Sequence, residues 1–425
     1  MKIEHKVTKL NSGLRVVSVP MSVESVTVMA MVGVGSRNED RQVGGVSHFI
    51  EHFMSNGTKK YKDKKDIWLA TERVGGIRNA YTSKQVTAYW SKVAKEHLEL
   101  ATDICRELVC LPLFPEKYLE KERGIILEEL KMYEDKPEVV AAQKFDELLF
   151  GDTGLGRDII GNRKSLQEMS IKKMKDFWQQ WYVPEEVVVG VAGGIESHDK
   201  FVELVEEKFV ELTKMSKKKP HGVLGNFSHE NSQVSLVNRP TEQAHLVLGL
   251  GSLKREVKER YALSIMNAVL GGMATSRFFQ KIREEMGLAY YIKSGVDAFV
   301  ETGSWGVAAG VKKEDVEDSI KVIVKEMRNF VGKNKPTKEE VDRAKTNLVG
   351  NIKLGMESSS DEVGRVVSGL VLENRVRPYK EIFEGIEAVR VEDVVAVAER
   401  IFKNGLNLSI VGPFEDKERF ERLLK

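Results

Sequence analysis

Residues 45–54 (GVSHFIEHFM) constrain the fold of this chain more than any other segment, because they predict a short helix with two chemically different faces. Apolar side chains recur at helical spacing on one face: Val46, Phe49, Ile50 and Phe53. Polar side chains recur at the same spacing on the other face: His48, Glu51, His52 and Ser55. Two imidazoles one turn apart can bind one metal ion, although a solvated polar face with two incidental histidines gives the same pattern.

A second helix, predicted over about 116–135, offers a third metal ligand. One of its faces combines apolar residues with two carboxylates: Leu119, Glu122, Ile126, Glu129, Leu130 and Tyr133. A buried carboxylate costs several kcal/mol unless it is paired or metal-bound. Glu129 is therefore a better candidate ligand than Glu128, which lies off this face. Glu122 suits either a role in orienting a ligand or a structural salt bridge, and the sequence leaves both open.

Two histidines and one carboxylate leave a coordination position free for water, as in catalytic zinc sites. The spacing of His48, Glu51 and His52 is His-x-x-Glu-His, in which the histidines bind zinc and the glutamate is the general base. Zinc lowers the pKa of its water and polarises a carbonyl group. Glu51 would take the proton of that water and pass it to the leaving amine. The predicted chemistry is peptide-bond hydrolysis.

The composition describes an ordinary globular chain. Its 425 residues predict about two to three domains. A formal net charge of +2 gives no global field for nucleic acid or membrane. The N-terminus has no apolar signal core, and no run reaches the roughly 18 apolar residues of a membrane span. Cys105 and Cys110 are expected to be reduced, packed thiols in a cytoplasmic protein.

The order of predicted elements in the first half of the chain restarts in the second half, which predicts two similar domains. The expected strand at 243–251, for example, parallels the strand at 25–34. A basic, Pro- and Gly-containing segment separates the halves. We place a zinc-bearing catalytic domain at 1–215, a linker at 216–226 and a homologous domain without the metal motif at 227–425. One zinc ion per chain is therefore expected.

Gly75 and Gly76 lead into a predicted strand that contains Asn79, Ala80 and Tyr81. This segment is either an ordinary strand entry or an edge strand to which an extended peptide adds by backbone hydrogen bonds.

Together these segments resemble the pitrilysin-type metallopeptidases, specifically the half-length branch related to mitochondrial processing peptidase and its bacterial homologues. The resemblance runs essentially end to end and includes 45–52, the helix around 126–135 and the segment 79–82. It implies an α+β fold of two similar domains, each a mostly antiparallel sheet packed against helices. It also implies zinc ligands His48, His52 and Glu129, with Glu129 at the expected 77 residues beyond His52. Gln85 and Thr153 depart from the family pattern without touching the proposed chemistry.

The resemblance assigns further roles. Glu122 matches the family's second glutamate, and Asn79, Ala80 and Tyr81 match its substrate-pairing strand. Arg283 and Tyr290, seven residues apart, match a pair that assists substrate binding and stabilises the transition state. In double-length relatives the zinc site comes from one half of the protein and this pair comes from the other half. A half-length chain carrying both sets is therefore expected to form a homodimer whose sites are completed in trans.

The leading interpretation is a zinc endopeptidase that cleaves oligopeptides or unfolded segments inside a closed chamber. One alternative is a processing peptidase that removes a leader from a specific precursor protein. A different class is a non-catalytic subunit, or one that needs a distinct partner chain. Non-catalytic relatives lose the zinc residues, whereas this chain retains them.

Overall fold

The computed structural model describes residues 4–212 and 232–424. These residues form two compact units, and each unit draws on three separate parts of the chain. The described residues within 1–130, 158–223 and 352–379 form unit 1. Those within 131–157, 224–351 and 380–425 form unit 2.

Unit 1 is built on a six-stranded sheet in the order β1-β2-β6-β3-β5-β4. The strands are β1 (Lys6–Lys9), β2 (Arg15–Pro20), β3 (Ser25–Val32), β4 (Ile77–Thr82), β5 (Thr87–Ala94) and β6 (Val187–Gly193). Strands β2 and β6 pair in parallel, and the remaining neighbours pair antiparallel. Strand β4 pairs with β5 on one side only, so β4 is an edge strand of this sheet.

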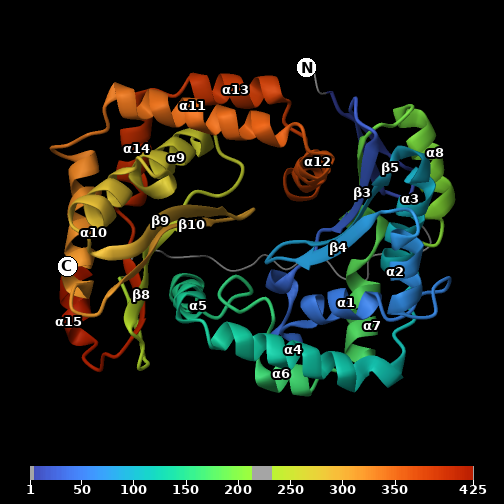
Figure 1. Cartoon of the computed structure of the whole chain (residues 1–425), viewed down its shortest axis with the longest axis horizontal. Coiled ribbons are helices and arrows are strands. Elements are labelled where there is room, and N and C mark those ends of the chain that lie inside the picture. Colours follow the sequence, from blue (N-terminus) through green and yellow to red (C-terminus); the bar gives the residue numbers. More distant parts are fainter. Residues whose placement is uncertain (1–3, 213–231, 425) are drawn as a thin grey trace. The chain divides into compact units, whose positions relative to one another are not determined.

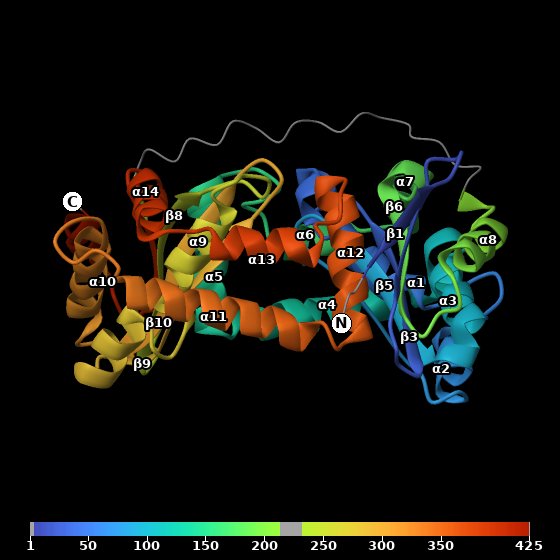
Figure 2. The same ribbon diagram turned by 90° about the horizontal axis from the view of Figure 1, so that it is seen from above.

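Helices cover both faces of this sheet (Figure 1, Figure 2). Helices α3 (Leu98–Cys110) and α8 (His198–Lys208) lie on one face, and α12 (Ser359–Glu373) lies on the other. On the first face, the Ser18 hydroxyl is 2.8 Å from His198 Nδ1. The remaining helices of this unit are α1 (Val46–Met54), α2 (Lys64–Glu72), most of α4 (Leu119–Glu134), α6 (Arg163–Gln167) and α7 (Ile171–Trp181).

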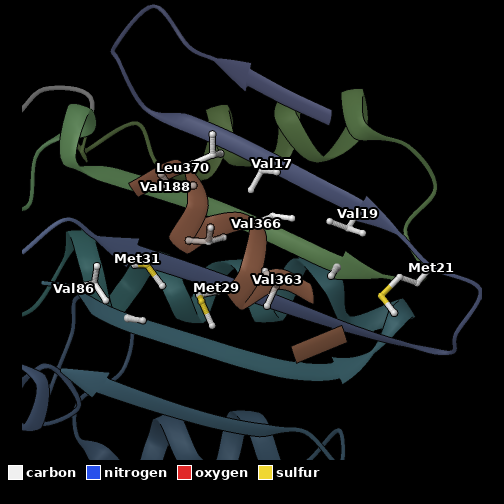
Figure 3. Close-up of a cluster of buried hydrophobic side chains, with 13 residues drawn as sticks. Val17, Val19, Met21, Met29, Met31, Val86, Val188, Val363, Val366 and Leu370 are labelled. Carbon is white, nitrogen blue, oxygen red and sulfur yellow. The ribbon is translucent and has the colours of Figure 1, made fainter. Parts of the chain in front are cut away.

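Helix α12 completes the core of unit 1, although it comes from the last quarter of the chain. Its residues Val363, Val366, Val367 and Leu370 pack on strand side chains that include Val17, Met29, Met31 and Val188 (Figure 3). The approach is close at Gly190 on β6, where an added Cβ would lie 2.3 Å from Val367 Cγ2. The valine, methionine and leucine side chains of this cluster named here are at most 5% exposed, so this face of the sheet is covered where α12 lies.

Unit 2 is built on a five-stranded sheet in the order β7-β11-β8-β10-β9. Its strands are β7 (Val234–Asn238), β8 (Gln243–Ser252), β9 (Ala289–Ala298), β10 (Gly303–Lys312) and β11 (Asn407–Gly412). Helix α5 (Pro137–Phe150) packs on this sheet through an apolar cluster that includes Phe145 and Val247. The further helices are α9 (Arg260–Asn267), α10 (Val316–Val331), most of α11 (Lys338–Gly355), nearly all of α13 (Tyr379–Glu387), α14 (Val391–Ile401) and α15 (Glu418–Glu421).

The predicted fold class is confirmed: each unit is a mostly antiparallel sheet packed against helices, and the two sheets have corresponding strand orders. The order β2-β6-β3-β5-β4 in unit 1 matches β7-β11-β8-β10-β9 in unit 2, and β2–β6 and β7–β11 are both parallel. Helices α10 to α14 lie between β10 and β11 in the chain.

The predicted domain boundaries, 1–215 and 227–425, stay a prediction, and the linker at 216–226 lies outside the described residues. The two compact units exchange one helix each relative to these linear boundaries. Helix α5 from the first half belongs to unit 2, and α12 from the second half belongs to unit 1. Each helix buries its apolar face on the sheet of that unit, which explains the exchange.

Cys105 and Cys110 are free and buried, as expected. Among residues 4–212 and 232–424, every helix is too short or too polar to cross a bilayer.

Candidate metal centre

Helix α1 begins at a position fixed by backbone geometry and by an acidic cap. Gly45 precedes the helix with φ +86°, a left-handed conformation that favours glycine. A Cβ at Gly45 would lie 2.3 Å from the Ile160 carbonyl oxygen. The buried Glu39 carboxylate accepts hydrogen bonds from the Gly45 N–H at 2.6 Å and the Ser47 N–H at 2.8 Å. A carboxylate at a helix N-terminus satisfies free N–H groups and complements the helix dipole.

The two faces predicted for α1 are present. The apolar face is buried, with Val46, Phe49 and Ile50 fully covered and Phe53 1% exposed. This face packs within unit 1, where α1 contacts α7, β4 and β5. The opposite face presents His48, Glu51 and His52 as partly exposed side chains. Burial of one face therefore fixes the direction in which both imidazoles point.

The structure brings His48 and His52 together with Glu129 of α4. Glu129 Oε2 lies 3.7 Å from His48 Nε2 and 3.5 Å from His52 Nε2, and the imidazole centroids are 4.6 Å apart. Donor atoms about 2.0–2.1 Å from one tetrahedral zinc ion are separated from each other by roughly 3.3 Å. Among the described residues, this triad is the one group of His, Cys, Asp or Glu side chains placed to hold a metal ion. The donor set and spacing fit zinc.

Helix α4 presents Glu129 rather than Glu128 to the histidines. Ile126 and Leu130 are buried on the same helix face, while Glu128 is exposed. Glu122, only 1% exposed, lies two turns before Glu129. Its Oε2 is 3.6 Å from His52 Nδ1, an ion-pair distance on the ring edge opposite Glu129. A carboxylate at this edge favours a proton on Nδ1 and leaves Nε2 to bind metal.

The two histidines titrate in opposite directions in the metal-free site. Burial lowers the pKa of His48 to about 4, and the neighbouring His52 adds to this effect. For His52, burial also lowers the pKa, but Glu122 and Glu129 outweigh it and raise the pKa to about 9. At neutral pH His52 is therefore protonated on both ring nitrogens, and binding of a metal ion at Nε2 would release one proton.

Glu51 is held beside the triad by a residue of the edge strand β4. The Thr82 hydroxyl donates a 2.7 Å hydrogen bond to Glu51 Oε2. Burial raises the pKa of Glu51, and the Thr82 hydrogen bond offsets part of that rise. A partly desolvated carboxylate with a raised pKa is suited to accept and return a proton.

The candidate substrate strand is β4, at the open edge of the unit 1 sheet. Asn79 and Tyr81 are exposed and Ala80 is partly exposed. The Ala80 N–H donates to Asn79 Oδ1 at 2.9 Å, so a side chain of the same strand occupies this donor. Strand β4 is thus an edge strand of the sheet, and its pairing with a substrate peptide stays a prediction.

Arg283 and Tyr290 belong to unit 2. Arg283 lies in the short π-helical segment Phe279–Glu285, where its guanidinium is 4.7 Å from the Phe279 ring centroid. Tyr290 lies at the start of β9 and is 75% exposed. Both side chains are exposed, and their role in catalysis stays a prediction.

Three residues near the site escaped the sequence reasoning: Glu39, Thr82 and Arg78. Glu39 stood in a charged loop, and only its spacing of six residues before Gly45 hinted at a cap. Thr82 and Arg78 lie within the predicted strand, but their contacts with α1 depend on how β4 crosses that helix.

Known proteins resemble this chain over most of its length. A family model described as "Insulinase (Peptidase family M16)" matches residues 15–163, and "Peptidase M16 inactive domain" matches residues 168–348. A relative from Mycobacterium tuberculosis, named an uncharacterized zinc protease, is 34% identical over 98% of this chain and 95% of its own length. Relatives of the same description from Streptomyces coelicolor and Bacillus subtilis are 32% and 30% identical, over 97% and 92% of this chain and 90% and 94% of their own lengths.

Two solved structures share the fold. A protease from Helicobacter pylori aligns over 97% of this chain and 100% of its own, with a TM-score of 0.90 and 24% identity. A structure from Pseudomonas fluorescens, described as a peptidase M16 inactive domain, aligns over 97% and 99%, with a TM-score of 0.89 and 20% identity.

Proposed function

Because this chain belongs to peptidase family M16, in which its curated relatives are named zinc proteases, we propose that it is a zinc-dependent endopeptidase acting on oligopeptides or unfolded polypeptide segments. The observation that carries this proposal is the convergence of His48, His52 and Glu129 with Glu51 held beside them. The single triad among the described residues supports one zinc ion per chain.

His48, His52 and Glu129 would hold the zinc ion, and Glu122 would orient His52 through Nδ1. Zinc bound there supplies a Lewis acid that polarises the scissile carbonyl and acidifies water. Glu51 accepts the proton of the attacking water as the new C–O bond forms. Glu51 then donates that proton to the leaving nitrogen as the C–N bond breaks. Thr82 holds the Glu51 carboxylate in place during both transfers.

The description "inactive domain" does not favour a non-catalytic scaffold for this chain. That model matches residues 168–348, whereas all five residues of the proposed centre lie within 15–163, which the peptidase model matches. These residues are His48, Glu51, His52, Glu122 and Glu129.

We further propose that the active species is a homodimer in which Arg283 and Tyr290 of one protomer complete the site of the other, around a chamber that admits unfolded chains. Support comes from the exposure of Tyr290 and from the family membership of a chain that carries both sets of residues. A location in the cytoplasm stays a prediction.

The homodimer proposal is tested by mixing two inactive variants, Glu51→Gln and Arg283→Ala. If sites form in trans, a mixed dimer contains one site with both native residues, and activity returns on mixing. Two variants that stay inactive after exchange of subunits would contradict the arrangement.

The endopeptidase proposal is tested with Glu51→Gln, which should retain zinc and the fold. Hydrolysis of an unstructured peptide library should fall by about 10²-fold or more, the contribution of a lost general base. Zinc content by atomic absorption and circular dichroism serve as controls. Undiminished cleavage by a zinc-loaded Glu51→Gln protein would refute the proposed chemistry.

A further inference from the structure

One face of strand β4 lies against the metal helix α1 along its length. Exposure alternates along Ile77–Thr82, with Arg78, Ala80 and Thr82 partly buried and their neighbours exposed. Thr82 contacts Glu51, and Arg78 Nη1 lies 3.5 Å from Ser55 Oγ. Glu51 and Ser55 are one helical turn apart on α1. Arg78 is therefore on the same side of the strand as the general base, four residues along from Thr82.

The Arg78 guanidinium is shielded from water without an acidic partner. It stacks on the Trp68 ring of α2, with 4.5 Å from Cζ to the ring centroid. Its Nε and Nη2 atoms are buried and have no hydrogen-bond acceptor among the described residues. Burial lowers the pKa of Arg78, and no carboxylate contributes an opposing effect.

Several other partly buried arginines among the described residues have carboxylate partners. Arg277, for example, forms a two-pronged ion pair with Glu340, with both N–O distances 2.7 Å. Removing a charged group from water costs free energy unless a counter-charge or hydrogen bonds replace the water. The stacking on Trp68 orients the guanidinium but does not satisfy its N–H groups. An anionic acceptor would satisfy these N–H groups and supply the counter-charge.

The position of Arg78 indicates where that acceptor would come from. A peptide added at the open edge of β4 runs alongside the strand, and alternate side chains project to the α1 side. With a rise of about 3.3 Å per residue, Arg78 lies roughly 13 Å along the strand from Thr82. A side chain about four residues from the one beside Thr82, and on the same face of the peptide, would reach the guanidinium.

We propose that Arg78 is a specificity-determining residue that binds an aspartate or glutamate side chain of the substrate peptide. This acidic residue lies several residues away from the scissile bond, on one side of it. This inference rests on the proposed peptidase function and deepens it. The carboxylate would accept hydrogen bonds from the guanidinium, and Trp68 would hold the guanidinium plane toward the β4 edge.

Peptide binding to the zinc-loaded Glu51→Gln protein tests the inference independently of turnover. The probes are fluorescein-labelled, unstructured decapeptides that differ only by aspartate or asparagine at one position, which is scanned along the peptide. We expect aspartate at one position to bind about 5- to 20-fold more tightly than asparagine, the range for a partly shielded charge-assisted contact. Arg78→Met in the same background should remove this preference and leave the affinity for the asparagine peptide within about twofold.

Arg73→Met is the matched control, because Arg73 is an exposed arginine of the same unit and the change in charge is identical. It should keep the aspartate preference. Three outcomes would overturn the inference: equal binding of aspartate and asparagine peptides at every position, absence of peptide binding, or an aspartate preference that survives Arg78→Met. Wild-type turnover separates the two hypotheses: cleavage of these peptides without an acidic preference refutes the role of Arg78 alone, whereas absence of cleavage refutes the proposed function.

Discussion

Replacing Thr82 with valine tests whether the edge strand positions the general base. Valine has nearly the shape of threonine and suits a strand equally well, so β4 should keep its pairing with β5. The substitution removes one group, the hydroxyl that donates to Glu51 Oε2 at 2.7 Å. Glu51 then keeps its partly buried environment but loses the bond that fixes its rotamer.

The size of the effect follows from that contact. A hydrogen bond to a charged group contributes about 1.5–3 kcal/mol. Each 1.4 kcal/mol corresponds to about a tenfold change in rate. If the bond is needed in the transition state, kcat should fall roughly 10- to 100-fold. KM should change little, because Thr82 holds the base and not the peptide.

Steady-state cleavage of an internally quenched peptide measures both constants. Thr82→Ser keeps a hydroxyl at the same position and should restore most of kcat, whereas a purely structural defect would not separate the two variants in this way. Zinc content should equal that of the wild type in both. A Thr82→Val protein with full zinc and unchanged kcat would refute the positioning role.

Three further predictions concern the third metal ligand, the proton on His52 and the packing of α12. Glu129→Gln should weaken zinc binding, whereas Glu128→Gln, at the exposed neighbouring position, should not, as measured by competition with a chromogenic chelator. Weaker zinc binding by Glu128→Gln than by Glu129→Gln would show that the wrong carboxylate was assigned. The pKa of His52 is about 9, so a proton must leave His52 when zinc binds. Zinc affinity should therefore rise about tenfold per pH unit between pH 7 and 8 and level off above about 9, and calorimetry in buffers of different ionisation enthalpy should register release of about one proton. An affinity for zinc that does not change with pH would contradict the assignment. Gly190→Ala should lower the free energy of unfolding by about 1–3 kcal/mol, because the added methyl group clashes with Val367. The control Gly124→Ala, in open space on α4, should leave stability unchanged or raise it slightly. Equal melting temperatures for the two variants would mean that α12 does not pack against Gly190.

The candidate centre was largely predictable from sequence because its key spacings are local. His48 and His52 share a helix face by virtue of a four-residue separation, and burial of Phe49 and Ile50 sets the direction of that face. The same reasoning on α4 selected Glu129 over Glu128. The resemblance to a known family supplied the long-range pairing of the two helices, which periodicity within either helix does not contain.

The contacts around the centre were not predictable, because they depend on elements that meet only after folding. Thr82 reaches Glu51 and Arg78 reaches Ser55 because β4 crosses α1 at one particular register. Glu39 caps α1 because the preceding loop turns back on the helix N-terminus.

The sequence by itself therefore determined the two-faced helix α1, the choice of Glu129 as the candidate third ligand and the repeated order of strands, since each follows from side-chain periodicity along the chain or from family resemblance. The tertiary structure alone decided which sheet each of α5 and α12 completes. Both helices carry apolar faces that would suit either sheet by pattern, and only the packing of side chains such as Val367 against Gly190 selects the partner.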